Sequence, residues 1–160
     1  LVSFSGALVA QSQKYADVRH RAIEWAEVSR PMPVTVWDVP CPGLMECVER
    51  GDFDSANVHE LLVRYVDPLT AHNVDEIVLG CTHYPFLANA IAKHAPKATL
   101  IDPAPAVAQQ LERRLAALDL ATPQTAPGTE RFFASGADAA REAVLRTLWS
   151  DPRVRLYEMD

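Results

Sequence analysis

Short apolar stretches alternate with longer segments of helical spacing along most of this 160-residue chain. Runs of about four to eight β-favouring residues between turn formers are typical of strands, and apolar residues three or four positions apart are typical of helices. The predicted strands cover residues 1–5, 34–39, 76–80, 99–102, 131–135 and 154–158. The predicted helices cover residues 11–29, 44–51, 56–72, 86–95, 104–119 and 137–149. This alternation predicts an α/β fold with a mostly parallel sheet flanked by helices.

The helix predicted over residues 56–72 carries clear signals at its amino end. Asp54 or Ser55 can cap it, because a short polar side chain accepts a hydrogen bond from a first-turn N–H group. Its predicted apolar face contains Val58, Leu61, Leu62, Tyr65, Val66 and Leu69. Gly51 is a suitable residue just beyond the preceding short helix, since glycine adopts a left-handed backbone readily. The turn-rich segment 121–130 is the predicted linker between two parts, residues 1–120 and 121–160.

Composition narrows the class of protein further. The chain is 49% hydrophobic and 22% charged, with a net charge of −6 and a pI near 5.3. An acidic chain is a poor candidate for nonspecific binding to nucleic acid or to an anionic membrane. No apolar run approaches the roughly 20 residues that span a bilayer. The sequence begins without a methionine and with no clear leader, so we expect it to be part of a longer protein.

The three cysteines are Cys41, Cys47 and Cys81. A small odd number argues against a disulfide scaffold and favours a reducing cytosol. No C-x-x-C pair is present, so a structural zinc site is not expected.

The stretch "EIVLGCTHYPFL", residues 76–87, contains the strongest candidate chemistry. In parallel α/β sheets, ligands bind outside the carboxyl ends of the strands. The groups predicted to lie there are Cys81 to Tyr84, Asp102, Ser135 with Gly136, and, after the strand over 34–39, Cys41, Glu46 and Glu49.

A thiol, a hydroxyl and an imidazole follow one another on this turn. Cys81 reacts only as a thiolate, which exposed backbone N–H groups favour. His83 can exchange a proton near neutral pH, and Thr82 can hydrogen-bond a carboxylate or oxyanion. The alternative is that Cys81 is a small buried hydrophobic residue and His83 an ordinary turn residue. Core packing is the favoured interpretation for Cys41 and Cys47.

Several motifs together resemble the glutamate racemases, in the cofactor-independent aspartate/glutamate racemase superfamily. "LGCTHYPFL" resembles the second cysteine motif of that family, and "CPGLMECVERGD" is similar to its Cys-Pro segment ending in Val-Glu-x-Gly. "LIDPAPAVAQQL" and "RFFASGADAAREAVL" resemble its Ile-Asp-Pro segment and its closing Ser-Gly turn. The likeness runs from about residue 12 to the end. The family's Asp-Ser pair, Tyr-Gly pair and first cysteine motif, Cys-Asn-Thr, do not occur in this sequence.

The resemblance implies an incomplete protein with flavodoxin-like lobes. Residues 1–120 would form the second lobe with its crossover elements, and 121–160 the closing segment of the first. In the family, two thiols exchange protons at the substrate Cα from opposite faces, without pyridoxal phosphate or a metal. Cys81 would be one of these thiols, the one used on L-glutamate, and His83 its proton-transfer partner. Thr82 and His83 would contact the substrate, and Glu49 would assist.

The resemblance also implies a biological setting. The substrate would be glutamate, the product would supply D-glutamate for peptidoglycan in a bacterial cytoplasm, and a homodimer is an assembly that the family often forms. Asp102 and Ser135 are expected to be structural. The alternatives are a racemase of aspartate or another amino acid, a cysteine hydrolase using Cys81 and His83, a catalytically inert piece, and a metal site at Cys41, Cys81 and His83. A link to gyrase inhibition, known for some members, is neither favoured nor excluded.

Overall fold

The computed structural model describes residues 2–5, 35–124 and 126–159. The chain divides into two compact units, each described by itself below. The first unit comprises residues 1–48 and Asp52–Pro103, and the second comprises Glu49–Gly51 and Ala104–Asp160. The turn-rich segment predicts a boundary after residue 120, whereas this division groups the helix that begins at Ala104 with the carboxyl-terminal segment.

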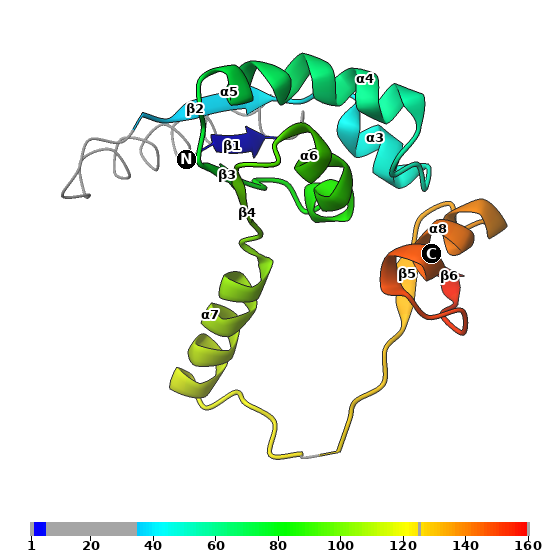
Figure 1. The fold of residues 1–160 in the computed structure, drawn as a ribbon. Coiled ribbons are helices and arrows are strands. Elements are labelled where there is room, and N and C mark those ends of the chain that lie inside the picture. Colours follow the sequence, from blue (N-terminus) through cyan, green and yellow to red (C-terminus); the bar gives the residue numbers. More distant parts are fainter. Residues whose placement is uncertain (1, 6–34, 125, 160) are drawn as a thin grey trace. The chain divides into compact units, whose positions relative to one another are not determined.

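A four-stranded parallel sheet organises the first unit (Figure 1). Its strands are β1 (Val2–Ser5), β2 (Trp37–Pro40), β3 (Glu76–Val78) and β4 (Thr99–Ile101), in the order β2-β1-β3-β4. Ser3 pairs with Asp38 on one side and with Val78 on the other, so β1 is central. The predicted parallel sheet is confirmed, with strands shorter than the sequence pattern indicates.

Five short helical segments connect these strands. They are α3 (Leu44–Glu49), α4 (Ala56–Tyr65), α5 (Asp67–Ala71), the 3-10 helix η1 (Tyr84–Leu87) and α6 (Ala88–His94). In Figure 1, α4 and α5 follow one another along one side of the unit, and α4 packs against α6. The helix predicted over residues 11–29 lies outside the described residues.

The single helix predicted over 56–72 is wrong, because the structure divides it at Val66 into α4 and α5. Pro68 explains the division. A proline within a helix lacks the N–H donor, and its ring clashes with the carbonyl group four residues earlier. Pro68 is tolerated here because it lies in the first turn of α5, where the N–H group would have no helical partner.

Both predicted helix ends in this region are confirmed. The Ser55 hydroxyl caps α4 by accepting a hydrogen bond from the Val58 N–H at 3.3 Å. Gly51 has a φ of +74°, and the Asp52 N–H donates to the Cys47 carbonyl at 2.9 Å, which is the closing bond of a Schellman motif. The helix predicted over 86–95 begins instead as a 3-10 turn, which starts at Tyr84 with Pro85 in its first turn.

The core of the first unit is a contiguous set of apolar side chains from the sheet and its helices. The largest fully buried side chains are Tyr84, Leu44, Leu62, Ile77, Leu79, Leu87, Ile91, Val48, Val58 and Val66. On the predicted apolar face of residues 56–72, Val58, Leu62, Val66 and Leu69 are buried, and Leu61 and Tyr65 are half-buried. The burial of these side chains favours the folded state by removing apolar surface from water.

The second unit contains a two-stranded parallel sheet and two helices. β5 (Phe132–Ala134) pairs with β6 (Leu156–Glu158), and α8 (Ala139–Trp149) connects them. The Glu142 carboxylate of α8 accepts hydrogen bonds from the Leu156 N–H at 2.9 Å and from Arg155 at 3.1 Å, which attaches the helix to β6.

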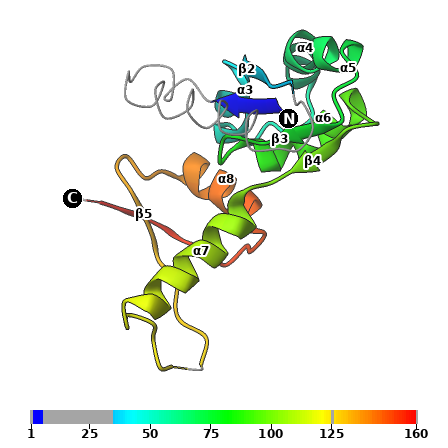
Figure 2. The same ribbon diagram turned by 90° about the vertical axis from the view of Figure 1, so that its left-hand side faces the viewer.

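The helix α7 (Ala104–Ala117) is a single uninterrupted helix in both views (Figures 1 and 2). The predicted amphipathic pattern is present, but its apolar side chains are exposed: Val107 by 66%, Leu111 by 60% and Leu115 by 37%. None of the α7 side chains is buried among the described residues.

The buried face of α4 yields a stability prediction. Leu62 is fully buried, so Leu62→Ala should lower the free energy of unfolding by about 2–5 kcal/mol, through lost burial and the remaining cavity. Val63, the next residue, is the matched control, because its own side chain is 52% exposed. Val63→Ala should change the free energy of unfolding by about 0.5 kcal/mol or less. Urea unfolding followed by circular dichroism measures both, and equal losses would contradict the assigned core.

Candidate active site

The strand order fixes where a ligand can approach the first unit. The chain passes from β1 to β2 on one side and places β3 and β4 on the other, so the order reverses between β1 and β3. Ligands of open α/β sheets bind at such a reversal, outside the carboxyl ends of the strands. Cys81 lies three residues beyond β3, and Cys41 directly follows β2. The topology therefore brings both turns to the same edge of the sheet.

The Cys81 turn presents three chemically active side chains in sequence. The Cys81 thiol and the His83 imidazole are half-exposed, and the Thr82 hydroxyl is exposed. The Cys81 Sγ lies 3.6 Å from His83 Nδ1, and Thr82 Oγ1 lies 3.5 Å from the same nitrogen. The turn is closed by the Tyr84 N–H, which donates to the Cys81 carbonyl at 3.1 Å. A thiol within reach of an imidazole can transfer a proton to it, and both groups are accessible to a ligand.

The buried Tyr84 side chain attaches this turn to the core of the first unit. Its side chain is fully buried, and its hydroxyl donates to the Cys41 carbonyl oxygen at 3.4 Å, joining the turns after β3 and β2. Burial, followed by the neighbouring Cys41 and Cys81, raises the pKa of the Tyr84 hydroxyl, so it stays neutral and remains a donor. The Tyr65 hydroxyl donates to the next carbonyl, that of Pro42, at 2.9 Å.

Cys41 lies near Cys81 but has a different chemical state. It is 1% exposed, and its thiol donates to the Val39 carbonyl at 3.3 Å. Burial first, then the charges of Asp38 and Cys81, raise the pKa of the Cys41 thiol far above its usual range. A thiol that stays protonated is neither a nucleophile nor a base. Cys47 is also fully buried, so the core-packing interpretation is confirmed for both residues.

Helix α3 carries two carboxylates, Glu46 and Glu49. Glu46 is half-buried, and its Oε2 is buried with no hydrogen-bond donor among the described residues. Its charge is one of the causes that raise the pKa of Tyr84, which puts Glu46 close to the buried tyrosine. Glu49 is exposed at the end of α3 and groups with the second unit, so its predicted position beside Cys81 stays a prediction.

Ser135 and Gly136 follow β5, which pairs with β6 in a separate two-stranded sheet of the second unit, so their predicted place beside Cys81 stays a prediction. Asp102 does follow β4 of the first sheet and is exposed. The sequence did not predict the role of Tyr84. Its burial is hard to foresee, because Tyr84 follows the polar Cys-Thr-His segment. The only local indication of burial is that Pro85 and Leu87 follow it.

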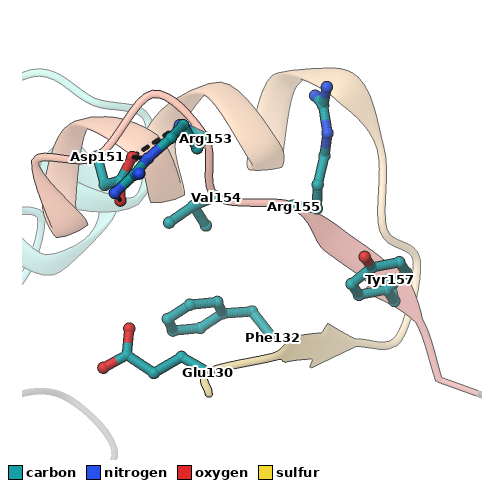
Figure 3. Close-up of a pocket in the computed structure, with 7 residues that line it drawn as sticks. All are labelled: Glu130, Phe132, Asp151, Arg153, Val154, Arg155 and Tyr157. Atoms are coloured by element: carbon teal, nitrogen blue, oxygen red, sulfur yellow. Dashed lines mark hydrogen bonds and ion pairs between the residues drawn. The ribbon is translucent and has the colours of Figure 1, made fainter. Parts of the chain in front are cut away.

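Two hollows elsewhere on the surface are lined by none of the candidate residues. One, of about 350 Å³, lies in the second unit, where the Asp151–Arg153 ion pair and the Glu130 carboxylate flank the apolar Phe132 and Val154 (Figure 3). The other, of about 370 Å³, lies at the amino ends of β3 and β4.

Within the described ranges, no three His, Cys, Asp or Glu side chains are grouped to hold a metal ion. Every helix in those ranges is too short or too polar to cross a bilayer.

Comparison with known proteins places these features in context. A family described as Asp/Glu/Hydantoin racemase matches residues 7–111. A glutamate racemase of Methylococcus capsulatus is 41% identical over 140 residues, which cover 87% of this chain and 49% of that protein. One of Herpetosiphon aurantiacus is 48% identical over 107 residues, covering 66% and 42%. The chain thus spans about half the length of the curated relatives it matches.

The fold is also similar to that of a glutamate racemase of known structure. The crystal structure of glutamate racemase from Francisella tularensis in complex with D-glutamate superposes with a TM-score of 0.73, at 19% identity, over 99% of this chain and 58% of that chain. The predicted α/β fold of the racemase type, incomplete relative to that protein, is confirmed.

The different environments of the three thiols predict selective modification. Iodoacetamide should modify Cys81 in the native chain about tenfold or more faster than Cys41 and Cys47, because only Cys81 is accessible. Peptide mass spectrometry at successive times measures the rates, and unfolding in urea should make all three react. Native Cys81→Ser should remain almost unlabelled. Rapid modification of Cys41 in the native wild-type chain would contradict its burial.

Proposed function

We propose that this chain provides one half of the active site of a glutamate racemase. The premise is that the chain belongs to the Asp/Glu/Hydantoin racemase family. One observation carries this proposal: a half-exposed cysteine thiol lies 3.6 Å from a half-exposed imidazole, at the carboxyl edge of a parallel sheet and within the matched residues. The relatives named glutamate racemase support the substrate.

The chemistry requires a base that can reach a very weakly acidic Cα proton. In the proposed reaction the Cys81 thiolate removes that proton, forming an S–H bond while the electron pair of the C–H bond stays on the substrate. A thiol on the opposite face then returns a proton to Cα, which inverts the configuration. That second thiol is expected from the family's first cysteine motif, which this sequence lacks. The reaction balances without an external oxidant, metal or organic cofactor.

His83 and Thr82 have separate proposed roles. His83 accepts the proton from the Cys81 thiol and returns it, which its distance of 3.6 Å supports. The exposed Thr82 hydroxyl, together with the His83 side chain, hydrogen-bonds the substrate. Charge developing at Cα is stabilised only if such donors are already oriented before the proton moves.

One carboxylate and one tyrosine have proposed assisting roles. Glu49 is proposed to assist proton transfer at His83, as the resemblance of its Val-Glu-x-Gly segment implies. Tyr84 positions the Cys81 turn through its bond to the Cys41 carbonyl, and Cys41 stays a neutral thiol behind it. Asp102 is proposed to be structural.

The same premise supports a wider setting. The proposed product, D-glutamate, is a component of peptidoglycan, and the enzyme would act in the bacterial cytoplasm as a homodimer. The crystal structure of the Francisella tularensis relative is a complex with D-glutamate, which supports a small-molecule substrate of this class. A racemase of aspartate remains the alternative within the family.

Cα proton exchange tests the proposal directly. The full-length protein that contains this chain, incubated in heavy water with L-glutamate, D-glutamate or L-aspartate, should exchange the Cα proton of glutamate in preference to aspartate, as followed by proton NMR. The isolated chain lacks the second thiol, so we expect it to be inactive or impaired. Cys81→Ser should reduce the exchange on the order of 100-fold, the range for loss of an acid–base group. Exchange of glutamate that persists in folded Cys81→Ser would remove Cys81 from the mechanism.

Cys47→Ser is the matched control. Cys47 is fully buried and its thiol accepts a hydrogen bond from Asn57 at 3.2 Å, so this variant should alter stability and leave exchange per folded molecule unchanged. A covalent acyl adduct on Cys81 in mass spectra would instead favour a cysteine hydrolase.

A further inference from the structure

A chain of hydrogen bonds outside the thiol turn joins three helical segments of the first unit. Asp67 of α5 contacts His94 Nδ1 of α6 at 2.8 Å, and His94 Nε2 contacts His59 Nδ1 of α4 at 2.9 Å. His59 Nε2 contacts Asp54 Oδ1 at 2.9 Å, and Lys93 donates to both Asp54 oxygens at 2.7 and 2.8 Å. The nitrogen–nitrogen contact is the unusual member.

Counting protons shows what this geometry requires. An ionised carboxylate only accepts hydrogen bonds, so His94 Nδ1 and His59 Nε2 must each carry a proton. A neutral imidazole has only one N–H, which would leave His94 Nε2 and His59 Nδ1 as two bare lone pairs 2.9 Å apart. Three hydrogen bonds need three protons, and two neutral rings supply two. One additional proton must therefore lie in the chain of bonds.

The additional proton belongs on the imidazole pair. Imidazole is more basic than a carboxylate by roughly 2 units or more in model peptides, so the pair binds the proton before either aspartate does. The charges then balance: Asp54 and Asp67 are negative, and Lys93 and the pair are positive. Hydrogen bonds from Lys93 and His59 lower the pKa of the Asp54 carboxyl, which keeps it ionised as the acceptor.

His94 of the pair lines a neighbouring hollow. The hollow of about 370 Å³ at the amino ends of β3 and β4 is lined by His94, and also by Thr70, Asn73, Val74, Asp75, Pro96, Lys97 and Ala98. Asp75 and Lys97 are the charged groups that face His94 there, and they have opposite signs. The His59 and His94 side chains are 33% and 14% exposed, so neither ring is sealed from water.

We propose that His59 and His94 share one proton and form a pH-dependent clamp between α4 and α6. The clamp holds α6, and α6 follows the Cys81–Tyr84 turn directly through η1. Without the shared proton, one of the three bonds is lost and two acceptors repel each other. With a second additional proton, two N–H groups face each other. The contribution of the clamp is therefore greatest when the pair carries one positive charge.

The sign of the pH dependence follows from linkage. A native state that holds one more proton than the unfolded chain loses stability as pH rises, because deprotonation then favours the unfolded chain. At acid pH the Asp54 carboxylate matters instead. Because its pKa is lowered in the folded state, its contribution to stability is present above pH 3.8, its ordinary pKa, and is lost as the pH falls through the lower folded-state pKa.

Nitrogen NMR of the histidine rings tests the shared proton in the wild-type chain. Long-range proton–nitrogen correlation at pH 7.5 distinguishes protonated from bare ring nitrogens. Three of the four nitrogens of His59 and His94 should be protonated, with the remaining one bare or averaged by exchange. Two bare nitrogens, or two unlinked neutral rings, would overturn the proposal, and this readout does not depend on the racemase assignment.

Two variants separate the shared proton from simple packing. His94→Asn retains a donor to Asp67 and removes Nε2, so it should abolish the fall in the folding constant between about pH 6.5 and 8. His72→Asn is the control, because His72 stacks on Trp37 with ring centroids 4.2 Å apart and lies outside the clamp. It should keep the wild-type pH dependence. An unchanged slope in His94→Asn would contradict the clamp.

Discussion

Burial of the Tyr84 side chain is the constraint on which the geometry of the candidate site depends. A tyrosine without solvent contact needs an acceptor for its hydroxyl, because an unpaired buried donor is costly. The acceptor is the carbonyl of Cys41, the residue that directly follows strand β2. One side chain therefore fills the core and joins two turns at the carboxyl edge of the sheet. The backbone of a tight turn cannot bury every residue, so Cys81 and His83 remain half-exposed.

Environment, rather than residue type, separates the three thiols. Cys41 and Cys47 are buried, and burial raises the pKa of the Cys41 thiol so that it stays protonated at neutral pH. Cys81 has the same side chain but lies on an accessible turn beside an imidazole. A neutral Cys41 also places no second negative charge beside Cys81, so a thiolate at Cys81 does not have to overcome repulsion from it. The buried thiol thus lies near the accessible one without adding a charge beside it.

Local patterns predicted the parts of this fold that local physics determines. Ser55 and Gly51 act over one helical turn, and both predicted helix ends are present. Pro68 also acts locally, yet its effect was missed because the apolar spacing continues across it. The separation of β5 from the first sheet could not be predicted from alternation alone, since strand pairing depends on partners far along the chain. The same applies to the contact between His59 and His94, which are 35 positions apart.

The Ser-Gly turn of the second unit shows how internal bonds limit a residue's available chemistry. The Glu158 carboxylate accepts hydrogen bonds from the Gly136 and Ala137 N–H groups at 2.7 and 2.6 Å. Arg141 donates to the Ser135 and Gly136 carbonyl groups at 2.7 and 2.6 Å. Gly136 has a φ of +67°, a backbone conformation that favours glycine, and a Cβ there would lie 2.8 Å from the Arg141 guanidinium, which would have to shift. Because these backbone groups already bind Glu158 and Arg141, they are not available as a cradle for an anionic ligand. The turn therefore fixes β5 to β6 and α8, which favours a structural role for Ser135 over a catalytic one.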